Sequence, residues 1–304
     1  MTSPISGVYP VLATPFAPDL SPDREGLRAI VNYAIDAGAD GVVYPGVASE
    51  YDTLATDERL GLVDTVASAS RGRVPLIVGA SASEPSHTIA LIEHARAIKA
   101  AAVMVMAPRA LTSAPDVVAF FAQIAQAGVP IMLQNAPPPA GSGLPVDIVL
   151  EVARSVSKIA YVKEEALPSG ARIAQLRAGA PSTLLGIFGG AGGRYITDEL
   201  ARGAVGTMPA AELVELHAAL FRAHRAGERS EVRRWFNRML PVLNMQAVFR
   251  WSLTKEVLRR RGIIEHAVKR APGPELDAGD HAELTELLAE LADVLAPPVM
   301  RSAP

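Results

Sequence analysis

One stretch of the chain, residues 74–135, decides the fold. It contains three apolar segments, VPLIVG (74–79), AAVMVMAP (101–108) and VPIMLQN (129–135), and the residues between them have the apolar spacing of helices. None of the three segments alternates strictly between apolar and polar residues, as a strand with one solvent-facing side does. Apolar runs of this length predict strands that are buried on both faces, as in a parallel sheet covered by helices.

The same alternation continues on both sides of this stretch. We expect strands at residues 7–12, 41–44, 75–78, 103–106, 130–133, 159–163, 184–186 and 205–208, with a helix after each of them. Eight alternating strands and helices predict an α/β protein with a (β/α)8 barrel. An open, doubly wound sheet is the structural alternative, but it would need a glycine-rich phosphate turn after the first strand, and GVYPVLATPF (7–16) has none.

The predicted domain organisation is a barrel over residues 1–210 and C-terminal helices over residues 211–304, packed on the barrel as part of the same domain. Helical spacing predicts these helices at residues 213–226, 232–239, 252–261 and 282–295. The stretch at 271–279, rich in proline and glycine, predicts a loop before the last helix.

Composition excludes several classes of function. The chain has 304 residues and a formal net charge of -3, which gives no electrostatic reason to expect nucleic acid or an anionic membrane as a partner. It has no cysteine, so disulfides, zinc–thiolate sites and thiol nucleophiles are excluded. No apolar run is long enough to span a bilayer and MTSPISGVYP (1–10) does not resemble a signal peptide, so we expect a cytoplasmic protein. The six histidines are scattered, so no metal site is expected, although a carboxylate-bound Mg²⁺ stays open.

Lys163 is the main candidate for chemistry, because it ends the expected strand IAYVK (159–163) at the barrel face where active sites lie. An amine in apolar surroundings loses its proton more readily and becomes a nucleophile. Glu165 follows two residues later and projects to the same side if the strand stays extended, where it could shuttle protons. A solvated lysine and a structural ion pair are the alternatives.

Two turns and two strand ends are candidates for substrate binding. The turn at 46–50 offers backbone N–H groups at Ala48 and Ser49 and the Ser49 hydroxyl, which suit a carboxylate, although such turns are common. The run GGAGG (189–193) lacks the position and spacing of a dinucleotide fingerprint, so we expect no cofactor there. Gly189 and Gly190 are expected instead to let the substrate approach the backbone. Gln134 and Thr207 add polar side chains at strand ends.

With these residues placed, the chain resembles the dihydrodipicolinate synthase / N-acetylneuraminate lyase superfamily. The resemblance runs from residue 7 to about Met208 and continues in the C-terminal helices. It rests on the order of four motifs: TPF (14–16), the GxxxE-type turn (46–50), LQNAP (133–137) and YVKEE (161–165). It implies that Lys163 forms a Schiff base with a small 2-keto acid without a cofactor, and that the protein is a homo-oligomer, either a dimer or a tetramer.

Departures from the family pattern narrow the expected reaction. Gln134 stands where the family usually has a tyrosine, and glutamine cannot shuttle protons as a phenol can, so dihydrodipicolinate synthesis is not expected. The usual arginine and the tyrosine of a neighbouring subunit fall near Pro139 and Ala110. Gln134, the Ser49–Glu50 turn and the Lys163–Glu165 pair instead resemble the branch that dehydrates 2-keto-3-deoxy sugar acids such as L-2-keto-3-deoxyarabonate. The GGAGG loop is not typical of that branch, so the sugar stays open.

The expected reaction is therefore a dehydration, with Lys163 as nucleophile, Glu165 as base and Gln134 holding an oxygen of the substrate. Two alternatives stay open. One is an aldolase that uses the same lysine and releases pyruvate, and the other is a small-molecule binding protein that has lost catalysis.

Overall fold

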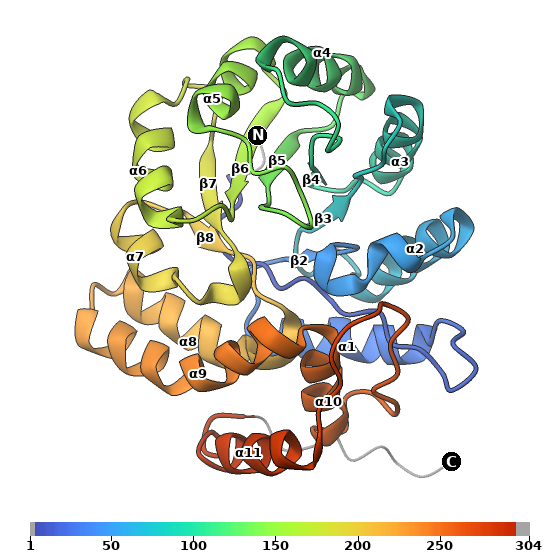
Figure 1. The fold of residues 1–304 in the computed structure, drawn as a ribbon, viewed down its shortest axis with the longest axis vertical. Coiled ribbons are helices and arrows are strands. Elements are labelled where there is room, and N and C mark those ends of the chain that lie inside the picture. The colour runs from blue at the N-terminus through green and yellow to red at the C-terminus, as the bar shows by residue number, and fades with distance from the viewer. Residues whose placement is uncertain (1–3, 296–304) are drawn as a thin grey trace. The chain divides into compact units, whose positions relative to one another are not determined.

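The computed structural model describes residues 4–295 of the chain (Figure 1). The chain divides into two compact units. Among the described residues, unit 1 comprises 4–7, Pro75–Ala191 and Tyr195–Met208. Unit 2 comprises Val8–Val74, Gly192–Arg194 and 209–295. The strands β1 to β8 occur along the described residues in the predicted order, each followed by a helix.

Unit 1 is a parallel sheet with helices along its outer side (Figure 1). Its strands lie side by side in chain order: β3 (Leu76–Gly79), β4 (Ala102–Val105), β5 (Ile131–Asn135), β6 (Ile159–Glu164), β7 (Gly186–Gly189) and β8 (Gly206–Thr207). The connecting helices are α3 (Pro85–Ala97), α4 (Ala114–Ile124), α5 (Val146–Ser155), α6 (Ser169–Gly179) and α7 (Ile196–Ala201). Every residue of these strands is buried, which confirms the prediction made for β3, β4 and β5 from their continuous apolar sequences.

Helix α4 illustrates how the sequence of unit 1 determines its packing. Ser113 caps the N-terminus and accepts a hydrogen bond from the Asp116 N–H at 3.3 Å. The apolar stripe predicted from spacing is buried, and Phe121 is fully so. Truncating a buried phenylalanine of this kind to alanine costs about 3–5 kcal/mol.

Strand β7 differs from the expectation. We expected residues 184–186, but the strand runs over Gly186–Gly189 and Leu185 is half exposed. The glycines of GIFGG (186–190) are typical of turns, so the sequence predicts no strand beyond Gly186. Pairing with β6, in which Phe188 lies opposite Lys163, outweighs this low local preference.

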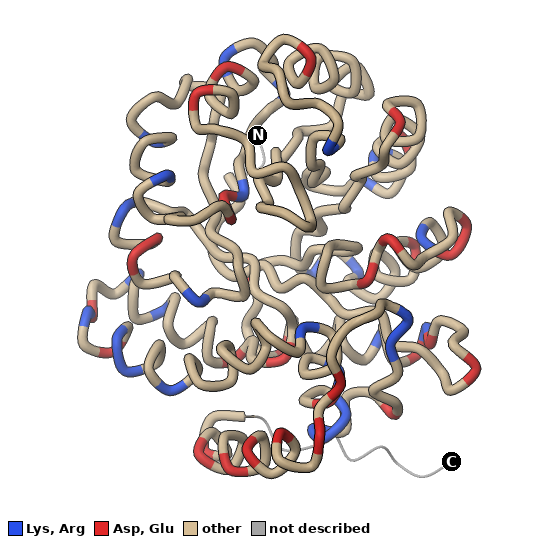
Figure 2. Tube along the Cα trace, viewed as in Figure 1, with Lys and Arg blue, Asp and Glu red and all other residues tan. Residues whose placement is uncertain are grey.

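Unit 2 is mainly helical. It contains α1 (Arg24–Asp36), β2 (Val42–Val43), η1 (Val47–Ser49), η2 (Tyr51–Thr53), α2 (Thr56–Ser70), η5 (Ala211–Leu213), α8 (Val214–Arg225), α9 (Arg229–Phe249), α10 (Trp251–Arg260) and α11 (Ala278–Ala289), while β1 (Gly7–Val8) lies where the chain passes from unit 1 to unit 2. Figure 2 shows the charged residues mainly on helices and loops, and the strands largely without charge. No helix within residues 4–295 combines the length and the apolar character that a bilayer crossing demands.

The C-terminal helices of unit 2 are present, with two differences from the prediction. Helix α11 begins at Ala278 and ends at Ala289, whereas it was predicted at residues 282–295. Helix α9 continues ten residues past Met239, where the prediction ended, and passes through Pro241. An internal proline destabilises a helix by about 3 kcal/mol, and for this reason the sequence predicts that the helix ends before Pro241. Burial of Val242 and Leu243 directly after the proline offsets that cost, at about 1.5–3 kcal/mol for each side chain. The predicted division of the chain at residue 210 stays a prediction.

Candidate active site

Lys163 and Glu165 of unit 1 meet on one side of strand β6. Nζ of Lys163 lies 3.1 Å from Oε1 of Glu165, and the side chains are 5% and 14% exposed. The backbone stays in register beyond the end of β6, because the Glu165 N–H donates to the Asn135 carbonyl at 3.1 Å. The prediction that Lys163 and Glu165 project to the same side of the strand depended on this extended geometry.

Three groups fix the Glu165 carboxylate. Besides Lys163, the Nε2 of Gln134 donates to Oε2 at 2.7 Å and the Ala191 N–H donates to Oε1 at 3.1 Å. Burial disfavours the charged form, but Lys163, Gln134 and the Ala191 amide together outweigh it and hold the pKa of Glu165 below its usual range. Glu165 is therefore a carboxylate at neutral pH, ready to accept a proton.

Glu164 points to the opposite side of β6 and is fully buried, as alternation along a strand requires. It accepts hydrogen bonds from Nδ2 of Asn135 at 2.9 Å and from the Ala166 N–H at 2.8 Å, and it forms an ion pair with Arg172 at 3.2 Å. Burial is the main cause that raises the pKa of Glu164 above its usual range. This cluster holds β6 in an orientation that directs Lys163 and Glu165 the other way. No three His, Asp or Glu side chains within residues 4–295 gather where they could hold a metal ion.

Gly189 and Gly190 separate two carboxyl groups. A Cβ atom on Gly190 would lie 2.4 Å from Oε1 of Glu165, and one on Gly189 would lie 1.9 Å from Oε2 of Glu199. At both positions, therefore, only glycine leaves room for the neighbouring glutamate side chain. We expected them to admit the substrate, whereas the structure shows that they admit two glutamate side chains. Their contact with a substrate stays a prediction.

Glu199 of helix α7 is a buried acidic residue that could not be identified from the sequence, because ITDEL (196–200) has the pattern of an ordinary helix N-terminus. Its Oε1 accepts a hydrogen bond from the Ser169 hydroxyl at 2.7 Å, and its Oε2 is buried with no hydrogen-bond partner in the described part of the chain. Burial raises the pKa of Glu199 to about 7, Ser169 opposes the shift, and the charges of Glu165, Asp198 and Glu164 add to it. A second carboxyl group that is partly protonated at neutral pH thus lies behind β7.

Thr207 ends strand β8 beside Gly189. It is fully buried, and its hydroxyl has no hydrogen-bond partner among residues 4–295. A buried hydroxyl without a partner costs about 1–3 kcal/mol. Such a group suits the recognition of a polar ligand. The binding of a substrate by Thr207 stays a prediction.

The predicted carboxylate-binding residues, Ala48 and Ser49, lie in unit 2 at the short helix η1. Ser49 is fully buried, and its Oγ donates to the Leu12 carbonyl at 2.5 Å and accepts from the Gly46 N–H at 2.9 Å. Oγ1 of Thr14 donates to the Ser49 carbonyl at 2.6 Å. Because the single hydroxyl hydrogen of Ser49 is engaged by Leu12, Ser49 holds the turn in shape. Its binding of a substrate, and that of Ala48, stays a prediction.

Comparison with solved structures shows the fold class. The dihydrodipicolinate synthase of Rhodopseudomonas palustris matches with a TM-score of 0.88 at 24% identity, over 94% of this chain and 98% of the other. The 4-hydroxy-tetrahydrodipicolinate synthase of Methylacidiphilum fumariolicum SolV matches with a TM-score of 0.88 at 25% identity, over 96% and 98% of the two chains. The fold is a (β/α)8 barrel with additional C-terminal helices, as predicted.

Sequence comparison gives the family. The model of the dihydrodipicolinate synthetase family matches residues 4–291, so the chain belongs to this family and is a lyase. The L-2-keto-3-deoxyarabonate dehydratase of Azospirillum brasilense is 29% identical over 94% of each chain. The 4-hydroxy-tetrahydrodipicolinate synthase of Chloroherpeton thalassium is 33% identical, over 53% of this chain and 54% of its own.

Proposed function

We propose that the protein is a Schiff-base lyase that dehydrates a 2-keto-3-deoxy sugar acid. The observation that carries this proposal is the contact between the buried Lys163 and Glu165, with Gln134 bound to the carboxylate where the wider family has a tyrosine. The similarity to a 2-keto-3-deoxyarabonate dehydratase over nearly the whole chain supports the same class of substrate.

The first half of the proposed mechanism forms the Schiff base. An ammonium group must lose a proton before it attacks a carbonyl, and the Glu165 carboxylate, 3.1 Å from Nζ of Lys163, is within reach to accept it. The amine then adds to the C2 carbonyl of the substrate, and one of its protons moves to the C2 oxygen to give a carbinolamine. Glu165 returns the first proton to that hydroxyl, water leaves, and an iminium ion remains on Lys163.

The second half removes water from the sugar. The positive iminium nitrogen acidifies the C3–H bond, and Glu165, a carboxylate again, takes that proton to give an enamine. The enamine expels the C4 hydroxyl as Glu165 hands the proton to it, so one water molecule is lost and Glu165 is regenerated. Hydrolysis of the new iminium ion releases the product and frees Lys163.

The remaining residues are proposed to bind and orient the substrate. Gln134 uses one amide hydrogen on Glu165, which leaves a second hydrogen and its carbonyl oxygen for the substrate. Ala48 and Ser49 are proposed for the carboxylate, and Thr207 for a hydroxyl group. A homo-oligomer and a cytoplasmic location are part of the same proposal.

An aldolase that uses the same lysine is the second candidate, because Glu165, 3.1 Å from Nζ of Lys163, could also serve as the base of that reaction. In that reaction Glu165 would take the proton of the C4 hydroxyl and the C3–C4 bond would break, which releases an aldehyde and leaves an enamine. Glu165 would return the proton to C3, and hydrolysis of the resulting iminium ion would release pyruvate.

Product analysis tests the proposal. A panel of 2-keto-3-deoxy acids is incubated with the protein and with Lys163→Met as the background control, and the products are identified by mass spectrometry. A product lighter by one water molecule, formed only with Lys163 present, is expected. Formation of pyruvate together with the matching aldehyde would indicate aldol cleavage in place of dehydration. Equal amounts of product with Lys163→Met would refute the mechanism.

A further inference from the structure

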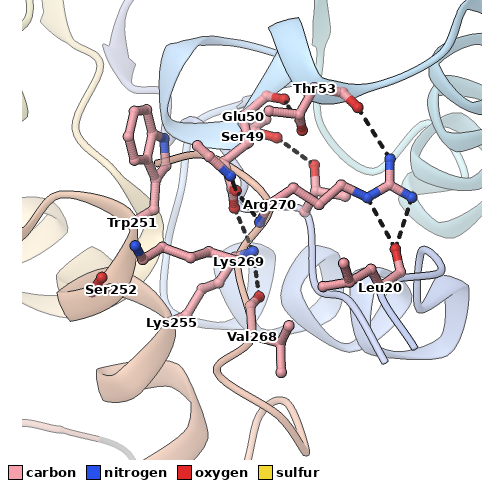
Figure 3. A network of polar contacts seen from close by, with 12 residues as sticks. Leu20, Ser49, Glu50, Thr53, Trp251, Ser252, Lys255, Val268, Lys269 and Arg270 are labelled. Carbon is pink, nitrogen blue, oxygen red and sulfur yellow. Dashed lines mark hydrogen bonds and ion pairs between the residues drawn. The ribbon is translucent and has the colours of Figure 1, made fainter. Parts of the chain in front are cut away.

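Unit 2 buries a lysine against the turn that we propose for carboxylate binding (Figure 3). Lys255 of helix α10 forms an ion pair with Glu50, the residue that ends the turn at 46–50, and both side chains are 0% exposed. Nζ of Lys255 also donates to the Val268 carbonyl at 2.8 Å and lies 4.2 Å from the centre of the Phe16 ring. Lys255 is thus a cation fully enclosed by unit 2.

The C-terminal part of the chain holds both oxygens of the Glu50 carboxylate. Lys255 engages Oε1, while Oε2 accepts hydrogen bonds from the N–H groups of Arg270 at 2.7 Å and Ala271 at 2.6 Å. Figure 3 shows the side chain of Lys255 and the backbone at Arg270 converging on Glu50 from helix α10 and from the loop that precedes α11.

A second contact from the same helix reaches the other end of the turn. The indole Nε1–H of Trp251 donates to the Val47 carbonyl at 2.8 Å. The guanidinium of Arg270 donates to the Thr53 carbonyl at 3.1 Å, just beyond the turn. Residues more than 200 positions away along the chain therefore fix the backbone on both sides of Ala48 and Ser49.

Stability alone does not account for this arrangement. A buried ion pair contributes little to stability, because the cost of removing both charges from water offsets their attraction. Glu50 also has a φ of 56°, a left-handed conformation that disfavours residues other than glycine. Strained backbone conformations cluster at functional sites, where a fixed local geometry is part of the mechanism.

We propose that Lys255 is a positioning residue for substrate binding: through Glu50, it holds the turn at 46–50 in the conformation that binds the carboxylate of the 2-keto acid. Lys255 itself does not touch the substrate. The inference rests on the proposed function, because it takes the turn as the carboxylate site of a Schiff-base enzyme.

The test uses a double variant, Lys255→Met with Glu50→Gln, which removes both charges together and so leaves no uncompensated buried ion. Lys269→Met is the matched control, since Lys269 is a second largely buried lysine, in the loop between α10 and α11, but pairs with Glu275 at 2.7 Å. The full-length proteins are titrated with pyruvate under borohydride, and adduct formation is followed by intact mass. Acetone serves as a second probe, because it has the same carbonyl group and a methyl group in place of the carboxylate.

We expect the half-saturating pyruvate concentration to rise 10- to 100-fold in the double variant, with the same maximal adduct and an unchanged response to acetone. The control should behave as the wild type. A merely structural role would weaken trapping of both probes alike, and that result, or an unchanged pyruvate titration, would overturn the inference while the Schiff-base mechanism stands. Failure of the wild type to trap pyruvate at Lys163 would instead overturn the proposed function and this inference with it.

Discussion

The substitution Gly190→Ala tests whether the position of Glu165 controls catalysis. The added Cβ atom would lie 2.4 Å from Oε1 and 2.5 Å from Cγ of Glu165, whereas real Cβ contacts stay beyond 3.0 Å and are ordinary above 3.4 Å. The carboxylate therefore has to retreat from the new Cβ by about 0.6 to 1 Å, which disturbs the contacts of Oε1 with Lys163 and the Ala191 N–H and of Oε2 with Gln134.

A misplacement of about 1 Å in a reacting group lowers the rate by about 100-fold, which corresponds to about 2.7 kcal/mol of activation free energy. We expect kcat for dehydration to fall by this factor in Gly190→Ala. Trapping of pyruvate at equilibrium should persist, because the Lys163 amine is unchanged.

Gly273→Ala is the control, since its Cβ would make an ordinary contact of 3.7 Å with the Trp251 ring. Kinetic measurements on both variants, with thermal unfolding to verify folding, complete the assay. A Gly190→Ala enzyme with wild-type kcat would refute the reasoning that this glycine exists to admit Glu165.

Three further predictions concern the same unit. Gly189→Ala should lower the unfolding temperature markedly, because its Cβ would lie 1.9 Å from Glu199, which is enclosed and cannot withdraw. Glu199→Gln should stabilise the protein by roughly 3 kcal/mol at pH 8 but not at pH 4.5. A carboxyl group whose pKa rises from 4.5 to about 7 on folding costs stability as pH increases through this window, and thermal unfolding at both pH values measures the difference. Gln134→Glu should move the acidic limb of the kcat profile upward by about one pH unit, since a like charge beside Glu165 raises its pKa, while exposed Gln123→Glu should leave the profile unchanged.

Much of the fold could be predicted because its determinants are local. Continuous apolar runs identified the strands β3, β4 and β5, and apolar spacing identified the helices between them. Two elements were predicted wrongly for the same physical reason. The glycines of β7 and the proline of α9 are unfavourable locally, and only pairing with β6 and the burial of Val242 and Leu243 outweigh them.

In the candidate site, too, the local contacts could be predicted and the long-range contacts could not. The meeting of Lys163 and Glu165 could be predicted from their spacing on one extended strand. The contacts of Glu199 with Ser169, and of Glu164 with Arg172, could not, because they depend on how helices settle on the sheet. The engagement of the Ser49 hydroxyl by Leu12 is likewise invisible in the sequence, since the two residues lie 37 positions apart.

The central claim is that Lys163 forms a Schiff base, and one measurement addresses it directly. The protein is incubated with pyruvate and borohydride, and its intact mass and peptide map are compared with those of Lys163→Met. The account predicts a single reduced pyruvate adduct, located on Lys163 and absent from the variant. A folded wild-type protein without this adduct, or an adduct that persists when Lys163 is replaced, would contradict it.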